Sequence, residues 1–400
     1  MTSNENKAPH QKHTKLERPA IGHFSRTELA ILGTPCGNIK KLAFAISQNL
    51  GATLKIAYVD ADHKNADTEA SNGPDLSSAL GNGATIEYTD KITFQRFDNK
   101  IGWNEYEQKA LFRQADLVLV NGNHFPAQAQ VIVIDPAKPL EKKLEKLTNV
   151  KLILLQEGVT EVPAFIQNHI PDFSQIPVFP LNNIQDITSF VQAYCQAGIP
   201  PLHGLVLAGG KSTRMQQDKG LLQYHGSDQR THVHQLLSEY CAEVYVSCNA
   251  TQVAEVANKL PYLEDRFLNL GPKGGILTAL QSNPNAAWLA VACDLPFLSA
   301  DTLAYLVQHR DPTKMATAFY DSEGKFPEPL LTIWEPRSYP QLLQFLSLGY
   351  SCPRKALINS DVKLLTIPDV AELRNVNDSI AYEQTVRELN KNNSLKQSDF

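Results

Sequence analysis

The sequence predicts a mixed α/β protein with two domains, each built as a mostly parallel sheet flanked by helices. Short apolar runs typical of strands alternate with amphipathic runs typical of helices along the chain, which is the signature of parallel α/β architecture. The segment AGIPPLHG (197–204) breaks this alternation, and its two prolines and two glycines are typical of a linker. The 400 residues suffice for two or three domains, each with a core of its own.

The expected strands of the first domain are six apolar runs: ELAILG (28–33), LKIAYVD (54–60), ADLVLVNG (115–122), AQVIVID (129–135), VKLILLQ (150–156) and IPVFPL (176–181). The run DITSFVQAYCQ (186–196) has the pattern of a closing amphipathic helix. A second series follows the linker directly, and its expected strands are HGLVLA (203–208), EVYVSCN (243–249), AAWLAVACD (286–294), KMATAFYD (314–321) and PEPLLTIW (327–334). We therefore expect domains over residues 28–197 and 198–386, and disordered polar ends over 1–27 and 387–400.

The charge balance and the cysteine spacing argue against several classes of partner and site. With 37 basic and 42 acidic residues, the chain has no basic excess that would point to nucleic acid or a membrane surface. We expect neither a signal peptide nor a membrane span, because no apolar run is suited to either. The six cysteines are scattered without a C-x-x-C pair, which argues against a disulfide framework or a zinc site. These observations predict a cytoplasmic protein.

The stretch LVLAGGKSTRMQQDKGLL (205–222) has the features of a loop that binds phosphate. Gly209 and Gly210 end an apolar strand and remove side chains where a backbone turns toward a ligand. The amides of such a loop, with a helix start behind it, favour an anion. Lys211, Arg214 and Lys219 add positive charge. The alternative is an ordinary turn from strand to helix with solvated basic side chains.

This stretch resembles the L-A-G-G-x-S-x-R-M-G-x-D-K signature of the molybdenum cofactor guanylyltransferases, the MobA family of nucleotidyltransferases. The resemblance covers about residues 202–385 and implies a Rossmann-like nucleotidyltransferase fold for the second domain. Gln216 departs from it, because the family usually has glycine there. Ser212 and Thr213 are expected to bond phosphate or to cap the helix. The nucleotide-binding residues implied by this stretch are Leu207, Ala208, Gly209, Gly210, Lys211, Ser212 and Lys219.

Two later segments match the family in the same order. EVYVSCNA resembles its second strand, which ends in a polar residue that contacts base or ribose, and both Ser247 and Asn249 fit that role. YLEDRFLNLGPKGGILTAL resembles an E-D segment followed by G-P-L-A-G, which implies that Asp265 lies near the nucleotide. Lys273 replaces the usual leucine of that motif. The glycines expected to pack against the nucleotide are Gly271, Gly274 and Gly275.

Asp294 is the candidate metal ligand. It closes the nearly all-apolar strand of AAWLAVACDLPFL, at the edge where an α/β sheet exposes its ligand crevice. One carboxylate together with phosphate oxygens suits Mg²⁺, or Mn²⁺ in its place. The metal-binding aspartate of the MobA family occupies this same C-D-x-P position. The alternative is an aspartate that only starts the turn before Pro296.

The acceptor side is implied by two weaker similarities. SCPRKALI resembles a region that offers basic residues to the acceptor, so Arg354 and Lys355 are expected at its phosphate unless they are a solvated helix start. ELRNVNDSIAYEQ is similar to the closing N-V-N-T-P-E-E-L of the family. Asn375 and Asn377 of this segment are expected to contact the acceptor or the metal shell. The alternative is that they cap the following helix, and Asp378 is a further candidate for that cap.

The resemblance implies transfer of GMP from GTP to the terminal phosphate of molybdopterin or Mo-molybdopterin, with release of pyrophosphate. Alignment and neutralisation of phosphate charge carry such a reaction, so Arg214, Lys219 and Asp294 are the expected catalytic residues. Gly209-Gly210 favours guanine, because cytidylyl relatives often read L-A-A-G. Molybdenum-insertion proteins and molybdoenzymes are the further partners implied. Two alternatives remain: a cytidylyl- or other nucleotidyltransferase for another phosphorylated acceptor, and a non-catalytic scaffold that binds the cofactor.

The first domain begins like a P-loop, in ILGTPCGNIKKLAFAI (31–46), but lacks its chemistry. Counting from Gly33 puts Asn38, Ile39 and Lys40 where a P-loop has its second glycine, lysine and hydroxyl. The layout resembles the MobB family of P-loop GTP-binding adaptors, with Asn121 in place of its Glu. We expect a degenerate P-loop-like fold kept for docking, dimerisation or cofactor delivery, with residual nucleotide binding by the 33–38 backbone as a minor alternative. His63 and His124 show no ligand spacing.

Overall fold

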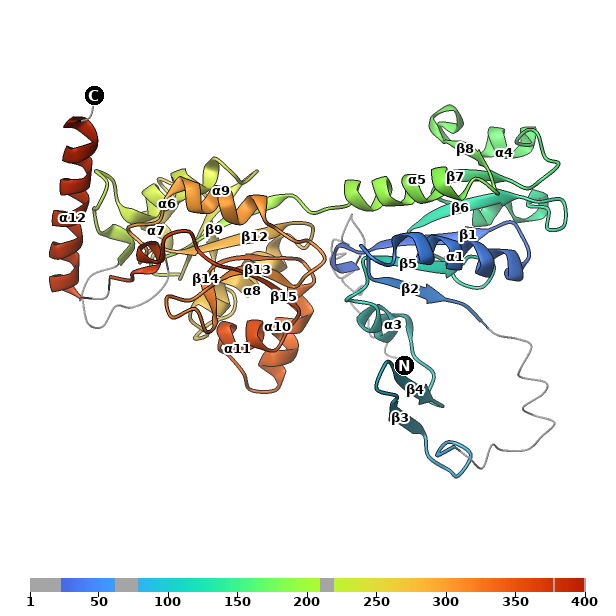
Figure 1. Ribbon diagram of the computed structural model, residues 1–400, viewed down its shortest axis with the longest axis horizontal. Coiled ribbons are helices and arrows are strands. Elements are labelled where there is room, and N and C mark those ends of the chain that lie inside the picture. Colours follow the sequence, from blue (N-terminus) through green and yellow to red (C-terminus); the bar gives the residue numbers. More distant parts are fainter. Residues whose placement is uncertain (1–22, 62–77, 209–218, 377, 399–400) are drawn as a thin grey trace, which may run out of the picture.

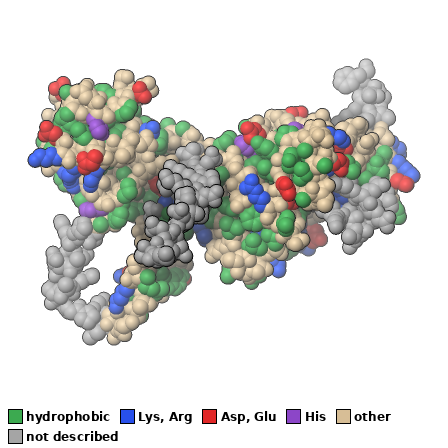
Figure 2. Space-filling view, turned by 180° about the vertical axis from the view of Figure 1, so that it is seen from behind, with side chains coloured by type: hydrophobic (Ala, Val, Ile, Leu, Met, Phe, Trp, Pro, Cys, Tyr) green, Lys and Arg blue, Asp and Glu red, His purple; other side chains and the backbone are tan. Residues whose placement is uncertain are grey.

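The computed structural model describes residues 23–61, 78–208, 219–376 and 378–398. They form two α/β bodies joined through one helix and a short extended segment (Figure 1). Figure 2 shows the same two bodies from behind. The predicted class, helix-flanked and mostly parallel sheets in two domains, is confirmed. The predicted boundary between residues 197 and 198 falls between the joining helix and the first strand of the second sheet.

The first sheet has six strands, all parallel, in the order β2-β5-β1-β6-β7-β8. Its strands are β1 (Thr27–Leu32), β2 (Ile56–Val59), β5 (Leu117–Asn121), β6 (Ala129–Ile134), β7 (Val150–Leu155) and β8 (Val178–Pro180). Its helices are α1 (Cys36–Leu50), α3 (Glu105–Leu111), α4 (Ala164–His169) and α5 (Ile184–Ala197), with short 3-10 turns at His23–Ser25, Glu141–Lys146 and Phe173–Gln175. The apolar faces of α1 and α5 pack together on one face of this sheet and form its main core.

A small hairpin of β3 (Ile86–Asp90) and β4 (Gln95–Asn99) was not expected from the sequence. It precedes α3 and lies beside the main sheet rather than within it (Figure 1). Its strands alternate polar and exposed apolar residues, and Ile92 at the turn is almost fully exposed. The hairpin therefore carries no continuous apolar run of the kind that marks the buried strands.

The second sheet has seven strands in the order β11-β10-β9-β12-β14-β13-β15, and only β14 runs antiparallel to its neighbours. Its strands are β9 (Leu202–Leu207), β10 (Val244–Cys248), β11 (Tyr262–Glu264), β12 (Ala287–Ala292), β13 (Ala316–Tyr320), β14 (Pro327–Trp334) and β15 (Val362–Leu365). Its helices are α6 (Gln229–Ser238), α7 (Val253–Val256), α8 (Pro272–Ser282), α9 (Ala300–Gln308), α10 (Ser338–Ser347), α11 (Pro353–Ile358) and α12 (Ser379–Ser398), with 3-10 turns at Lys219–Leu221 and Val370–Leu373. Two apolar clusters, one on each face, make up its core.

The polar C-terminal end differs from expectation. Residues 387–398, predicted to be disordered, continue α12, which stands at one end of the molecule (Figure 1). The reason is a sparse apolar stripe on the first half of the helix, which packs against three buried residues of the second domain. The stripe is Ala381, Tyr382, Val386 and Leu389, and the residues below it are Leu222, Tyr224 and Val376. Disorder was also predicted for residues 1–27, but His23–Ser25 form a 3-10 turn and Thr27 begins β1, while residues 1–22 lie outside the described residues.

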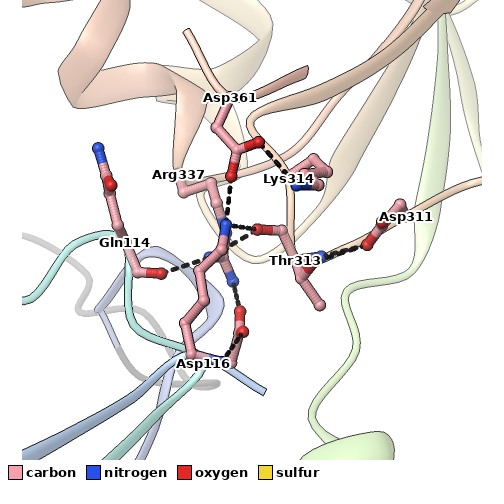
Figure 3. A network of polar contacts seen from close by, with 8 residues as sticks. Gln114, Asp116, Asp311, Thr313, Lys314, Arg337 and Asp361 are labelled. Atoms are coloured by element: carbon pink, nitrogen blue, oxygen red, sulfur yellow. Dashed lines mark hydrogen bonds and ion pairs between the residues drawn. The ribbon is translucent and has the colours of Figure 1, made fainter. Parts of the chain in front are cut away.

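The two domains contact each other through the amino-terminal edges of their sheets. From the first domain, Lys55 and Asp116 lie just before β2 and β5, while Thr313 and Asp361 lie just before β13 and β15 in the second. Arg337 follows the antiparallel β14 and so reaches the same edge, where it binds the Asp116 carboxylate and the Gln114 and Thr313 carbonyls (Figure 3). The Lys55 ammonium donates to the Thr313 carbonyl at 2.9 Å and pairs with Asp361. The carboxyl-terminal edges of the two sheets therefore face away from each other.

Within the described ranges, no helix combines the length and the apolar character that a membrane crossing requires.

Candidate active site

The candidate site lies where three parallel strands of the second sheet end side by side. Leu207 in β9 is paired with Ser247 in β10 on one side and with Ala292 in β12 on the other. Parallel strands bring their carboxyl ends to one edge, where α/β sheets form their ligand crevices. The predicted residues Ala208, Asn249 and Asp294 follow these three strands directly. The fold thus brings together residues from segments that are far apart in the sequence.

Asp294 lies beside both ends of the glycine-rich loop. At the loop's start, the Cys293 amide donates to the Leu207 carbonyl at 3.4 Å. At its end, the Lys219 ammonium is 3.2 Å from Asp294 Oδ2, with the two side chains 24% and 20% exposed. The predicted catalytic pair of Lys219 and Asp294 is therefore in direct contact.

The second carboxylate oxygen of Asp294 has the environment of an open ligand position. Oδ1 is buried and has no hydrogen-bond partner among the described residues. A buried carboxylate oxygen without a partner is costly, and a hard cation is one group that relieves the cost. No group of three or more His, Cys, Asp or Glu within the described ranges is placed to hold a metal ion.

Ser247 and Asp265 form one polar unit at the end of β10. The Ser247 hydroxyl donates to Asp265 Oδ1 at 2.6 Å. Burial raises the pKa of the Asp265 carboxyl, and the hydrogen bond from Ser247 offsets part of that rise. Gly275 packs directly beneath this pair, since a Cβ there would lie 2.3 Å from Ser247 Oγ. The predicted glycine at 275 is thus required by close approach to Ser247.

The other two predicted glycines have different roles in the same loop. Gly274 approaches the Phe267 carbonyl so closely that a Cβ would lie 2.3 Å from its oxygen. Gly271 has φ of 56°, in the region that favours glycine, and it begins α8. Lys273, the departure from the family motif, is fully buried and donates to the Tyr350 carbonyl at 2.7 Å. It therefore ties the start of α8 to the segment before α11.

Asn249 organises the turn after β10. Its side-chain oxygen accepts from the Thr251 amide at 3.0 Å and hydroxyl at 2.6 Å. Gln252, which the sequence analysis did not single out, connects this turn to the glycine-rich loop. Its Oε1 accepts from the Asn249 amide at 3.1 Å and its Nε2 lies 3.5 Å from the Ala208 carbonyl. The only sequence feature that pointed to this role of Gln252 was its polar side chain three positions after Asn249.

The two basic acceptor candidates are placed differently. Arg354 contacts two carboxylates, Glu328 at 3.1 Å and Asp321 at 3.6 Å. Burial raises the pKa of Glu328. The charge of Arg354 lowers this pKa and the charge of Asp294 raises it, so both residues act on the same carboxyl group. Lys355 is exposed on α11, and no contact within the described residues ties it to that carboxyl group. Glu328, a carboxylate inside an apolar strand, is the functional candidate that sequence reasoning missed.

The segment before α12 also reaches the site. The Val376 amide donates to the Asp294 carbonyl at 3.2 Å, which brings the exposed Asn375 next to the aspartate. Asp378 accepts from the Ala381 amide at 2.8 Å, so its expected role as a helix cap is confirmed. The predicted site residues outside the described residues are Gly209, Gly210, Lys211, Ser212, Thr213, Arg214 and Asn377.

The degenerate loop of the first domain sits at the opposite end of the molecule, after β1 (Figure 1). Lys40 is exposed on α1, and its ammonium lies 5.7 Å from the centre of the Phe44 ring. It therefore points along the helix surface and not into the loop, as the one-residue shift predicts.

The second domain is similar to known proteins. The family described as "MobA-like NTP transferase domain" matches residues 204–362. A molybdenum cofactor biosynthesis bifunctional protein from Synechocystis sp. is 35% identical over 185 residues, 46% of this chain and 53% of that protein. A molybdenum cofactor guanylyltransferase from Pasteurella multocida is 33% identical over 147 residues, 36% of this chain and 77% of that protein. A probable molybdenum cofactor guanylyltransferase from Carboxydothermus hydrogenoformans is 31% identical over 189 residues, 46% of this chain and 93% of that protein.

Among solved structures, molybdopterin-guanine dinucleotide biosynthesis protein A from Archaeoglobus fulgidus aligns with a TM-score of 0.41 at 17% identity, covering 48% of this chain and 99% of that chain. The chain spans about half the length of the bifunctional relative from Synechocystis. The family match does not include residues 28–197, so the resemblance of the first domain to MobB stays a prediction.

Proposed function

Because the chain belongs to the family of molybdenum cofactor guanylyltransferases, we propose that its second domain transfers GMP from GTP to the terminal phosphate of molybdopterin or Mo-molybdopterin. The products are the guanine dinucleotide cofactor and pyrophosphate. The observation that carries the proposal is the pairing of Lys219 with Asp294 at the end of β12, with the second carboxylate oxygen buried and open to a ligand. A non-catalytic scaffold would have no use for that arrangement.

On the donor side, Lys219, Arg214 and Lys211 hold the triphosphate. The backbone of the glycine-rich loop, from Leu207 and Ala208 through Gly209, Gly210 and Ser212, cradles it at the end of β9. Lys219 supports this role because its ammonium already lies at the strand end where the phosphates must pass. Its positive charge neutralises phosphate oxygens and aligns the α-phosphorus with the incoming acceptor oxygen.

The base and ribose are recognised at the end of β10. The Ser247 hydroxyl is committed to Asp265, which leaves the carboxylate as the acceptor for donor groups of the nucleoside. The Asn249 oxygen is committed to its own turn, so its amide group is the part that donates. Gly275 lets the first turn of α8 pack closely against this unit, and Gly271 supplies the positive-φ turn before the helix.

Asp294 is the proposed ligand of Mg²⁺, which Mn²⁺ can replace. When bound, the ion would neutralise charge on the phosphates of donor and acceptor. The fit rests on the unpartnered Oδ1 and on the hard oxygen chemistry of a carboxylate. Lys219 holds the other oxygen, so the side chain is oriented before substrate arrives.

The acceptor phosphate is held by Arg354, Lys355, Asn375 and Asn377. Arg354 supports this assignment best, because it pairs with Glu328 and Asp321, and the charge of Asp294 also acts on Glu328. Asn375 is the next best supported, because it lies next to the Asp294 carbonyl. The first domain, which we propose to be MobB-like, serves docking, dimerisation or delivery of the cofactor, with molybdenum-insertion proteins and molybdoenzymes as partners.

The proposal is tested by measuring pyrophosphate release from the full-length chain with Mg²⁺ and a molybdopterin-type acceptor, comparing GTP, CTP and ATP. We expect release with GTP, lowered about 100-fold or more by Asp294→Asn, since a metal clamp is worth several kcal/mol. Release with CTP alone would keep the mechanism and replace guanine by cytosine. Nucleotide binding without release under any of these conditions would favour the scaffold.

A further inference from the structure

Cys36 occupies the place in the first domain where a P-loop holds phosphate. It is the first residue of α1, a helix of 15 residues, and follows Pro35, which supplies no side-chain cap. The amides at such a helix start carry partial positive charge. The Cys36 sulfur lies 3.3 Å from His124 Nε2, although the two residues are 88 positions apart in the sequence. Both side chains are only half-buried, so small reagents reach them.

Further donors converge on the same sulfur. Asn123 Nδ2 is 3.5 Å from Cys36 Sγ and also donates to the Thr34 carbonyl at 3.1 Å, which fixes the amide in place. Burial alone would raise the pKa of the Cys36 thiol. The hydrogen bonds from Asn121 and Asn123 and the charge of Lys138 outweigh that effect and the opposing charge of Asp60, and the thiol pKa lies below its usual value. Asn121 stands where the resembled family has a glutamate, so a repelling charge is replaced by a donor.

Asp60 belongs to the same cluster as Cys36 and His124. Asp60 accepts from Tyr58 at 2.7 Å and from Asn121 at 2.7 Å. Burial raises the pKa of Asp60, but these hydrogen bonds, the Ala61 amide and the charge of His124 together lower it. Asp60 therefore stays ionised in this cluster.

We propose that Cys36 and His124 form a thiolate–imidazolium pair and that Cys36 is a nucleophilic thiol whose substrates are small disulfides. The thiolate attacks one sulfur of the disulfide, the S–S bond of the substrate breaks, and the other sulfur leaves as a thiolate with the bond's electron pair. The disulfide itself is the oxidant, and a mixed disulfide at Cys36 is the product. A free thiol reverses the step.

The other cysteines of the chain differ from Cys36 in thiol pKa or in exposure. Burial raises the pKa of Cys195 to about 11, of Cys241 to about 12 and of Cys248 to about 11, which makes them poor nucleophiles. Cys293 is buried and Cys352 is exposed. Within the described part of the chain, no group of three or more His, Cys, Asp or Glu side chains is placed to hold a metal ion.

The test is the reaction of the full-length chain with dithiodipyridine, a chromogenic disulfide, followed by thiopyridone release as a function of pH. At about pH 6 an ordinary thiol is less than about 1% thiolate. We expect a fast phase there, absent in Cys36→Ser and slowed roughly tenfold or more in His124→Asn, because an uncharged partner no longer stabilises the thiolate. Cys352→Ser is the matched control, and the fast phase should survive it.

Two results would overturn the proposal: a fast phase that persists in Cys36→Ser, or one that His124→Asn leaves at its full rate. If either variant fails to fold, mass spectrometry of the unaltered chain labelled briefly at about pH 6 decides the question. A label on Cys36 supports the proposal and a label on Cys352 alone contradicts it. Cys36→Ser should leave GTP-dependent pyrophosphate release unchanged, which separates this test from that of the transferase.

Discussion

Arg337 and Asp116 form a buried ion pair that joins the two domains across 221 positions of sequence, with Nη2 2.7 Å from Oδ1 and both side chains 7% exposed (Figure 3). Asp116 also accepts from the Lys55 amide at 2.8 Å, and Arg337 also donates to two carbonyls. Because both charges are nearly removed from water, the pair depends on its partners for solvation.

Arg337→Met is therefore expected to lower the free energy of unfolding by about 3–5 kcal/mol, since it leaves Asp116 buried without its counter-charge. Urea denaturation measures this directly. Arg113→Ala is the matched control, because Arg113 donates to Gln344 at the same interface from an exposed position. Its cost should stay within about 0.5 kcal/mol. Equal costs for the two variants would mean that the buried pair does not couple the domains.

Lys219→Met is expected to reduce kcat of GMP transfer by roughly 100-fold, because the charge that aligns and neutralises the triphosphate is lost. Stability should change little, since the side chain is partly exposed and lies in a site open to substrate. Steady-state kinetics of the full-length chain give the measurement. Lys325→Met is the control, because that lysine pairs with Glu323 on the open surface. A full rate in Lys219→Met would remove the lysine from the mechanism.

Gly275→Ala should weaken GTP binding and cost about 1–3 kcal/mol of stability, because the new methyl group would lie 2.3 Å from Ser247 Oγ. The displaced hydroxyl would also lose its hydrogen bond to Asp265. Calorimetric titration with GTP and denaturant unfolding report the two effects separately. Gly102→Ala is the control, since a Cβ there meets nothing within 4 Å. Unchanged GTP affinity in Gly275→Ala would place the nucleoside elsewhere.

Asp265→Asn is expected to raise stability at neutral pH while it weakens nucleotide binding. Burial raises the pKa of Asp265, so the folded state keeps its proton at pH values where the unfolded chain has released it. The free energy of unfolding therefore falls as pH rises from the ordinary carboxyl pKa through the raised folded-state pKa. The asparagine variant should lack this fall, because it has no charge to bury. Denaturation curves across that interval test it, and a fall of equal size in both proteins would contradict it.

The sequence predicted the buried strands well because each is a continuous apolar run, from ELAILG to PEPLLTIW. It did not give the direction of β14, since an apolar run reads the same in a parallel or an antiparallel strand. It also predicted disorder for the second half of α12. The four apolar residues of its packed stripe become informative only once the fold brings Leu222 and Tyr224 beneath them.

Most site features that the sequence did not predict are contacts between side chains that are far apart in the sequence. The neighbourhood of Asp294 could be predicted because its residues follow strands that recur in a known order. Glu328 could not, since its contact with Arg354 arises only when α11 lies against β14. The contact of Cys36 with His124 depends in the same way on β1 and β5 being neighbours in the sheet.

The two sheets contact each other by their amino-terminal edges, and this limits how a ligand can pass from one domain to the other. The Asp294 crevice and the Cys36 loop open back to back, so a molecule bound at one cannot be handed across to the other within a single chain. Whatever the first domain captures reaches the transferase crevice only by release into solvent, or from a neighbouring copy turned to face it. Two copies arranged head to tail would place the first-domain loop of one copy opposite the Asp294 crevice of the other, and a ligand would then pass from one molecule to the next.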